Sequence, residues 1–203
     1  MARIPLEERR RLLVAATLAV IQRDGIAGAT ARRIVQEADM PLGALHYAFD
    51  SVDHLLTAAA DEVTASERLV AEEGLASAGD ASLRDAIHAG LDRYIDLLEE
   101  RPGHELAFLE LMLHASRARL GSPAGPGRYE ESYRLVAALL AQAATAAGAT
   151  WQRPVGELAR HTVTVLDGIT TTWLADHDTA AARATARFHA DALAALATTP
   201  DPS

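Results

Sequence analysis

Two Glu-x-x-x-His pairs come nearest to metal chemistry: Glu110 with His114, and Glu157 with His161. Carboxylates and imidazoles on the inner faces of a helical bundle hold two iron or manganese ions, but such sites use a Glu-x-x-His spacing of three residues. A spacing of four still places both side chains on one helix face, where a salt bridge is the ordinary outcome. The sequence therefore predicts no metal site and no cofactor.

Other catalytic signatures are missing from the sequence. It contains no glycine-rich phosphate loop, no His-Glu-x-x-His motif and no nucleophile elbow. It also has no cysteine, which excludes disulfide bonds and thiolate metal sites. We therefore do not expect the chain to be an enzyme.

The elements that would carry these residues are all helices. Alanine and leucine dominate, and apolar residues recur at three- and four-residue spacing. Gly25 and Thr30 are suited to end one helix and begin the next. The predicted helices cover residues 6–24, 31–38, 42–49, 52–73, 82–100, 104–120, 129–148, 155–176 and 179–198. Linkers are expected at 74–82 and 121–128, and a frayed tail at 198–203.

This pattern predicts an all-α fold class with about nine helices. Residues 1–51 would form an N-terminal three-helix domain, and residues 52–203 a larger C-terminal helical bundle. The chain has no run of about 18 apolar residues, so we expect no membrane span and a cytoplasmic protein. An apolar run after Arg9–Arg11 imitates a signal peptide, but Gln22, Arg23 and Asp24 interrupt it.

The second and third predicted helices, joined by a tight turn, form a helix-turn-helix arrangement. In such a motif the third helix enters the major groove of DNA, which is wide enough to hold it. Arg32 and Arg33 begin the second helix, next to the positive end of its dipole. A DNA phosphate nearby would relieve that repulsion; the alternative is that two exposed arginines tolerate the small cost.

The distribution of charge leaves DNA binding open. The net charge of −9 argues against a nucleic-acid partner. However, residues 1–50 hold seven Arg against six acidic residues, whereas residues 51–203 hold twelve against twenty-two. The acidity therefore lies outside the helix-turn-helix region.

Residues 11–56, from "RLLVAATLAV" to "SVDHLL", resemble the DNA-binding domain of the TetR (tetracycline-repressor) family of transcriptional regulators. The match covers about 45 residues and contains no insertion or deletion. The matching positions are Arg9, Leu12, Leu13, Ala15, Ala16, Gly25, Thr30, Arg32, Ile34, Ala38, Gly43, Leu45, Tyr47, Phe49, Asp53, Leu55 and Leu56. The resemblance implies a homodimeric, ligand-responsive regulator, most simply a repressor, that binds a palindromic operator in double-stranded DNA.

The resemblance also implies roles for individual residues. Leu42, Gly43 and Ala44 would face base edges. Leu45 and Phe49 would pack the third helix against its neighbours. The phosphate contacts would come from Thr30, Arg32, His46 and Tyr47. Arg33 is a further DNA-binding candidate, because it lies beside Arg32 at the start of the second helix.

Four positions depart from the family's usual pattern. Asp39 replaces a Gly, Pro41 a Ser or Thr cap, Ala48 a His, and Val52 a Lys. Asp is able to enter the left-handed region, so the turn is expected to survive. Fewer phosphate contacts predict weaker, less discriminating DNA binding with a shallow salt dependence. The alternative is a helical ligand-binding or protein-interaction module with weakened DNA binding.

In this family the C-terminal bundle binds an effector and dimerises, so the resemblance implies both roles for residues 52–203. Dimerisation is expected through the last two helices, the alternative being that their small residues are intramolecular core. The candidate residues for a small-molecule effector site, each of which could instead be ordinary core, are Leu91, Tyr94, Phe108, Met112, Tyr133, Asp167, Thr170 and Trp173.

Two polar stripes are interpreted as solvated helix faces. The first comprises Asp85, His88, Asp92, Asp96 and Glu99, and the second Glu110, His114 and Arg117.

Overall fold

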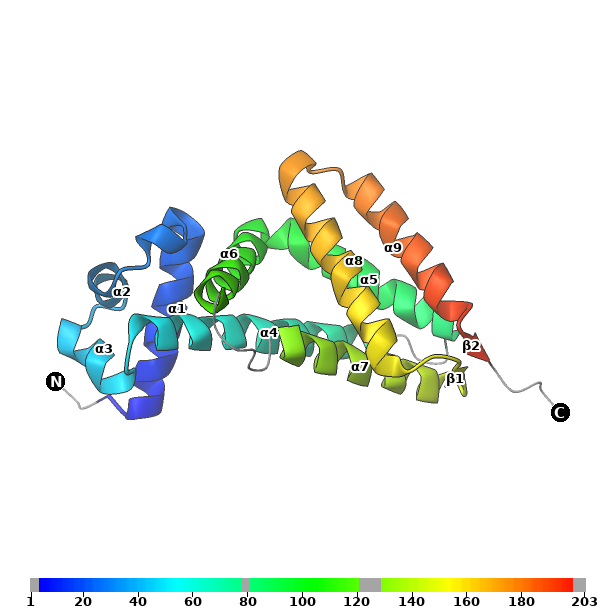
Figure 1. The fold of residues 1–203 in the computed structure, drawn as a ribbon, viewed down its shortest axis with the longest axis horizontal. Coiled ribbons are helices and arrows are strands. Elements are labelled where there is room, and N and C mark those ends of the chain that lie inside the picture. The colour runs from blue at the N-terminus through cyan, green and yellow to red at the C-terminus, as the bar shows by residue number, and fades with distance from the viewer. Residues whose placement is uncertain (1–3, 78–80, 121–128, 199–203) are drawn as a thin grey trace. The chain divides into compact units, whose positions relative to one another are not determined.

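The computed structural model describes residues 4–77, 81–120 and 129–198, and for residues 67–77 it describes the backbone alone. These residues are helical apart from short turns and two strands of two residues each, as Figure 1 shows, so the all-α prediction is confirmed. The elements are α1 (Leu6–Asp24), η1 (Ile26–Gly28), α2 (Ala31–Glu37), α3 (Leu42–Ala48), α4 (Val52–Ser77), α5 (Leu83–Glu100), α6 (Pro102–Arg119), α7 (Tyr129–Ala146), β1 (Thr150–Trp151), α8 (Val155–Asp176), α9 (Thr179–Ala194) and β2 (Ala197–Thr198).

The chain divides into two compact units. The first unit comprises residues 1–65 and 103–125, and the second comprises residues 66–102 and 126–203. Because α6 belongs to the first unit, that unit is built from two separate stretches of sequence. The predicted functional boundary at residues 51 and 52 coincides with the start of α4 and stays a prediction. The predicted linker at 121–128 and most of the tail lie outside the described residues.

The ends of α1 and α2 follow from local chemistry. Gly25 ends α1 with φ +71°, and its N–H donates to the carbonyl of Ile21. Thr30 caps α2 by accepting a hydrogen bond from the backbone N–H of Arg33 at 3.4 Å. Both ends lie where the sequence predicts them.

Asp39 ends α2 in the left-handed conformation, with φ +51°. The Met40 N–H donates to the carbonyl of Val35 at 2.8 Å, and the Asp39 N–H to the carbonyl of Gln36 at 3.2 Å. These two bonds form a Schellman motif, which satisfies carbonyls at the end of the helix. The prediction that the turn survives with Asp in place of Gly is confirmed.

The core of the first unit is formed where α1 to α4 meet. Leu13, Ile34, Leu45 and Leu55, one from each helix, are fully buried. Arg10 of α1 adds a polar connection, since its Nε donates to the carbonyl at the end of α3 at 3.0 Å. The short third helix is therefore held by packing at its centre and by a hydrogen bond at its end.

Three polar side chains of α6 contact other elements of the first unit. Glu110 accepts a hydrogen bond from the backbone N–H of Ile26 at 2.6 Å. The Nε2 atom of His114 lies 3.3 Å from Asp53 Oδ1. The Nδ1 atom of His104 lies 3.4 Å from Gln22 Nε2. His114 is exposed, as predicted for a solvated face, whereas the half-buried Glu110 binds a backbone N–H distant in sequence, so the prediction is wrong for Glu110.

The second unit packs α5, α7, α8 and α9 around one apolar core. Its most buried residues include Ile95, Leu98, Leu158 and Ala190. The chain after α9 pairs as β2 with β1, Thr198 opposite Thr150 and Ala197 opposite Trp151. The predicted helix 179–198 therefore ends early, at Ala194.

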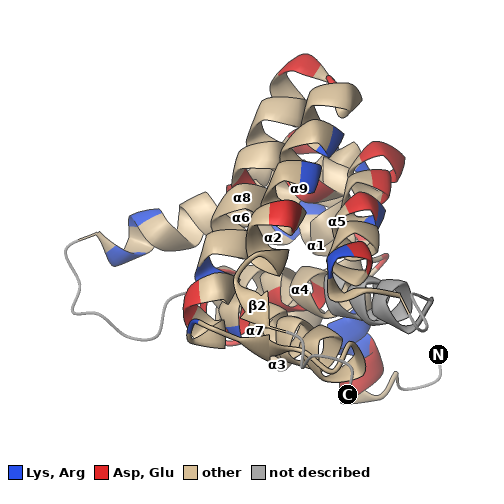
Figure 2. Ribbon diagram, turned by 90° about the vertical axis from the view of Figure 1, so that its right-hand side faces the viewer, with Lys and Arg blue, Asp and Glu red and all other residues tan. Residues whose placement is uncertain are grey.

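The acidic stripe of α5 faces a single arginine of α9 (Figure 2). Arg183 lies 3.2 Å from Asp92, 2.6 Å from Asp96 and 3.2 Å from Glu99, each measured from a guanidinium nitrogen to a carboxylate oxygen. The three carboxylates are exposed or half-exposed, as predicted for a solvated stripe, but the prediction did not include their pairing with Arg183. They connect two helices of the second unit.

Candidate functional site

Helix α3 presents one buried side and one exposed side. Leu45 and Ala48 point into the core and are buried, as is Phe49 just after the helix. The side chains of Leu42 and Tyr47 are 42% and 62% exposed. Of the other residues predicted to contact DNA on this helix, Gly43 and His46 are exposed and Ala44 is half-buried. The structure therefore brings the predicted α3 residues to one outward-facing surface.

The cations next to this surface are largely paired within the protein. Arg33 Nη1 lies 3.1 Å from Asp24 Oδ2, and Arg23 Nη1 lies 2.9 Å from Glu37 Oε2. Arg32 is exposed, and among the described residues no ion pair involves it. Of the two arginines at the start of α2, only Arg32 carries a charge with no internal counter-ion there.

Two arginines of α1 contact aromatic rings, one on α3 and one just after it. The Arg9 guanidinium lies over the Tyr47 ring, 4.9 Å from its centroid. Arg10 lies over the Phe49 ring at 5.2 Å and bonds the carbonyl of Ala48. Sequence reasoning missed both contacts, because nothing in residue spacing shows which arginine of one helix reaches an aromatic ring of another.

The positions that depart from the family's pattern have different surroundings. Pro41 is the N-cap of α3 with φ −70°, and no side chain caps this helix. Val52 is half-buried, so an apolar residue suits its surroundings. Ala48 is buried, which makes it a packing position. This geometry is compatible with the predicted loss of a DNA contact at Pro41 and at Val52.

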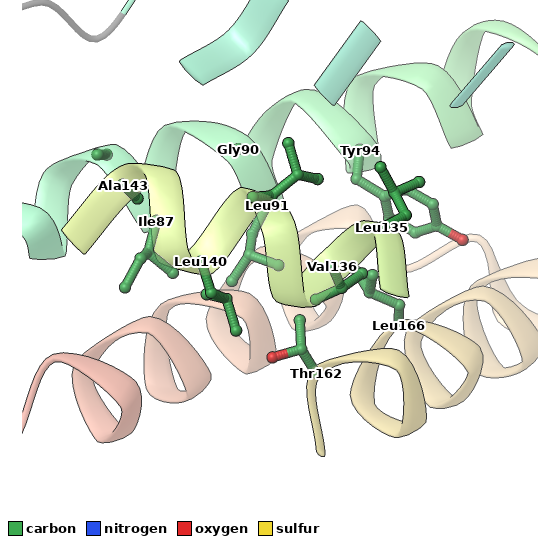
Figure 3. A pocket seen from close by; sticks show the side chains of 12 residues that line it. Ile87, Gly90, Leu91, Tyr94, Leu135, Val136, Leu140, Ala143, Thr162 and Leu166 are labelled. Atoms are coloured by element: carbon green, nitrogen blue, oxygen red, sulfur yellow. The ribbon is translucent and has the colours of Figure 1, made fainter. Parts of the chain in front are cut away.

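The second unit contains a cavity of about 140 Å³ between α5, α7 and α8, shown in Figure 3. Aliphatic side chains make up most of its wall. The lining residues are Ala86, Ile87, Gly90, Leu91, Tyr94, Leu135, Val136, Leu139, Leu140, Ala143, Thr162 and Leu166. Figure 3 shows the α5 and α7 side chains gathered along two neighbouring helices, with Thr162 and Leu166 coming from α8.

Two of the eight predicted effector residues, Leu91 and Tyr94, line this cavity. A third, Thr170, lies beside it through a hydrogen bond, its Oγ1 being 2.5 Å from the Tyr94 hydroxyl. Phe108 and Met112 are buried in α6 of the first unit, so the structure does not bring them to the cavity.

The remaining three predicted effector residues are engaged elsewhere in the second unit. Trp173 is buried, and its Nε1 donates to Thr179 Oγ1 at 3.0 Å. Tyr133 stacks on Tyr129 with ring centroids 5.9 Å apart. Asp167 is hydrogen-bonded to Tyr129, and burial raises the pKa of its carboxyl group. None of the three lines the cavity.

The polar part of the cavity wall is a hydrogen-bonded chain. The Thr162 hydroxyl donates to the carbonyl of Leu158 at 2.9 Å, and His189 Nε2 lies 3.0 Å from the same oxygen. A hydroxyl has only one hydrogen, so His189 is the donor in the second bond. Burial lowers the pKa of His189, which favours the neutral ring.

Several lining residues were not predicted, and two of them had a signal in the sequence. Gly90 lies inside a predicted helix, where glycine costs about 1 kcal/mol relative to alanine and so calls for a structural reason. Leu140 belongs to an apolar stripe with Val136 and Ala143 at three- and four-residue spacing. Thr162 had no such signal.

Helices α8 and α9 leave an outward face of small residues around one large aromatic ring. Phe188 of α9 is 77% exposed. Exposed small residues that recur at three- and four-residue spacing on the two helices include Thr164, Gly168, Thr171, Thr172, Ala181, Ala184 and Thr185. We call this set, with Phe188, the α8–α9 face.

Neither Glu-x-x-x-His pair gathers further ligands in the described part of the chain. Glu110 binds a backbone N–H, and Glu157 lies 3.8 Å from His161 and close to Arg153. Across residues 4–77, 81–120 and 129–198 no group of three or more His, Asp or Glu side chains is placed to hold a metal ion. No helix there is long and apolar enough to cross a membrane.

Comparison with known proteins connects both sites to one family. Residues 13–59 match the model of the bacterial regulatory proteins of the tetR family. The HTH-type nicotine-responsive transcriptional repressor HdnoR of Paenarthrobacter nicotinovorans is 28% identical over 174 residues, which are 86% of this chain and 88% of that protein.

Two solved structures extend the match over nearly the whole chain. The multidrug-binding protein EbrR in complex with imidazole is 29% identical, with a TM-score of 0.66 and 97% of each chain covered. A TetR-family member from Streptomyces coelicolor A3 is 30% identical, with a TM-score of 0.62, and the match covers 90% of this chain and 98% of that one. The chain therefore belongs to the tetR family of bacterial regulatory proteins, which are DNA-binding transcriptional regulators.

Proposed function

We propose that this protein is a ligand-responsive repressor that binds a palindromic operator as a homodimer. The observation that carries the proposal is the two-sided α3. Its inner side is fixed in the core by Leu45, and its outer side presents Leu42, Gly43, His46 and Tyr47 to solvent. A surface of this kind on the second helix of a helix-turn-helix fits the major groove.

In this proposal each residue of the face has a distinct task. Leu42, Gly43 and Ala44 approach base edges. With no hydrogen-bonding side chain among them, sequence is recognised through thymine methyl groups, backbone groups and DNA shape. Arg32, Tyr47, Thr30 and His46 bind phosphates. Arg33 binds one as well if it exchanges its ion pair with Asp24 for a phosphate.

Dimerisation through the α8–α9 face follows from its chemistry. Small residues permit two helices to approach closely, and Phe188 supplies apolar area that is exposed in the single chain. A two-fold dimer would place two copies of α3 on successive major grooves, about 34–36 Å apart or a multiple of it.

The cavity between α5, α7 and α8 is the proposed effector site. Relatives of this chain respond to nicotine in one case and were crystallised with imidazole and malachite green in others. An effector that binds more tightly to the state of the dimer that does not fit the operator would shift the dimer to that state and so lower its operator affinity. No catalytic step is part of this function.

Selection of bound sequences from random double-stranded DNA tests the proposal. We expect an enriched palindrome, and expect Arg32→Ala and Tyr47→Ala each to weaken binding to it by about tenfold or more. Arg134→Ala on α7 is the control, because it removes another exposed arginine, from the second unit. Its operator affinity should equal that of the unmodified chain.

The same selection distinguishes the alternative, a ligand-binding or protein-interaction module with weakened DNA binding. The pairing of Arg23 and Arg33 with carboxylates is the observation that favours this alternative. A module of that kind would enrich no sequence at physiological salt, and its residual DNA affinity would be equally insensitive to Arg32→Ala and Arg134→Ala.

A further inference from the structure

None of the described residues that line the α5–α7–α8 cavity is charged at neutral pH. Their polar atoms belong to two side chains, the phenol of Tyr94 and the hydroxyl of Thr162. Transfer of an ion from water into such surroundings costs free energy unless a group of opposite charge is present there. The described lining residues offer none.

Four ionisable side chains near the cavity, on α5, α8 and α9, have partners within the protein. Asp167, one residue after the lining Leu166, is hydrogen-bonded to Tyr129. Asp92 and Asp96 of α5 bind Arg183 of α9. His189 donates to Thr162 from behind the wall. A charged ligand would therefore find no free counter-ion among these groups.

The hydroxyls fix what kind of hydrogen bond the cavity offers. The hydrogen of Thr162 is used on Leu158, and one of its two lone pairs accepts from His189. The remaining lone pair is an acceptor for a ligand. The Tyr94 hydroxyl is already hydrogen-bonded to Thr170 Oγ1. Ligands with an O–H or N–H group match this wall.

The size of the cavity limits the ligand. At about 140 Å³ it is close to the engineered apolar cavities of about 150 Å³ that bind benzene. From size, charge and hydrogen bonding together, we infer that this cavity takes an uncharged ligand of about one ring that carries a single hydrogen-bond donor. The inference rests on the proposed ligand response and specifies the chemical class of its effector.

Four probes that share one ring test the class by calorimetry at pH 7: benzyl alcohol, toluene, benzylammonium and benzoate. We expect benzyl alcohol to bind several-fold tighter than toluene, which lacks the donor, and about tenfold or more tighter than either ion. Tighter binding of benzylammonium or benzoate would overturn the inference, and so would failure of benzyl alcohol to bind.

Gly90 allows the site of binding to be checked with the intact chain. A Cβ at Gly90 would meet no atom within 4 Å, so Gly90→Leu fills the cavity without a clash at its first carbon. We expect this variant to lose about tenfold or more in affinity for benzyl alcohol, and Gly90→Ala to lose less. Gly156→Ala is the control, since its Cβ also meets open space and Gly156 lies outside the cavity wall. Unchanged affinity in Gly90→Leu would overturn the inference.

Operator binding separates this inference from the proposed function. If benzyl alcohol binds in a Gly90-dependent way but leaves the affinity for the selected palindrome unchanged, the ligand class stands and the ligand response fails. If an ion releases the palindrome while benzyl alcohol does not bind, the ligand response stands and the inferred class is wrong.

Discussion

Glu110 Oε2 lies 2.6 Å from the backbone nitrogen of Ile26, a residue 84 positions earlier in the chain. The bond connects α6 to the turn between α1 and α2. Gly25 precedes Ile26, and its φ of +71° favours glycine there. A residue that resembled a metal ligand in the sequence is thus a structural contact of the first unit.

Replacing Glu110 is expected to destabilise the first unit. Glu110→Ala leaves the half-buried Ile26 N–H without its carboxylate acceptor, which costs about 1 to 3 kcal/mol. Glu110→Gln keeps an acceptor oxygen and should lose less. Urea unfolding measures the difference, with the exposed Glu131→Ala as a control that costs under about 0.5 kcal/mol. Equal stability of Glu110→Ala and the unmodified chain would show that this bond contributes nothing.

Asp39→Gly is expected to stabilise the chain. Left-handed backbone costs about 1 to 2 kcal/mol for residues with a Cβ, and Asp relieves part of that cost locally. Glycine at φ +51° should therefore raise the free energy of unfolding by about 0.5 to 1 kcal/mol. Gly148 lies at the corresponding position after α7, with φ +62°. The reverse change there, Gly148→Ala, should lower the free energy of unfolding. Thermal melting of both variants checks the signs, and a lower melting temperature for Asp39→Gly would contradict the argument.

The salt dependence of operator binding is expected to be shallow. Each neutralised phosphate adds about −0.9 to the slope of log affinity against log salt concentration. Arg23 and Arg33 already bind Glu37 and Asp24, so few cations of each chain remain for phosphates. Titration of the selected palindrome at several salt concentrations measures the slope. A slope of about −6 or steeper, corresponding to six or more phosphates, is incompatible with this prediction.

Helix positions were predictable from the sequence wherever a strong local signal marks both ends. The bounds of α1 and α8 agree with prediction, because Gly25 ends the first and Pro154 begins the second. The two-residue pairing of β1 with β2 was missed. It depends on a partner segment that comes 46 or more residues later in the chain, and two residues carry no periodicity.

Tertiary relationships of side chains were less accessible to prediction. Leu91 and Tyr94 were expected in the effector site and line the cavity, whereas Phe108 and Met112 have the same apolar and aromatic character but lie in the first unit. The type of a residue shows that its side chain is apolar, but it does not show in which of the two cores that side chain is buried. The α3 face was easier, since Leu45 and Tyr47 belong to one short helix whose period decides which side each faces.

Asp167→Asn is expected to stabilise the chain at pH 7 and to have no effect near pH 3. Burial raises the pKa of Asp167, although a hydrogen bond from Tyr129 opposes the rise. A carboxyl group whose pKa is higher in the folded than in the unfolded chain contributes stability below its ordinary pKa of about 3.9, and loses it as pH rises through the folded value. Asparagine keeps the acceptor for Tyr129 without the charge, so the gain at pH 7 should be about 0.5 to 1 kcal/mol, reduced for a half-exposed group. Urea unfolding at both pH values measures it against Glu62→Gln, an exposed carboxylate within α4. A loss of stability at pH 7 in Asp167→Asn alone would mean that the ionised carboxylate stabilises this part of the fold.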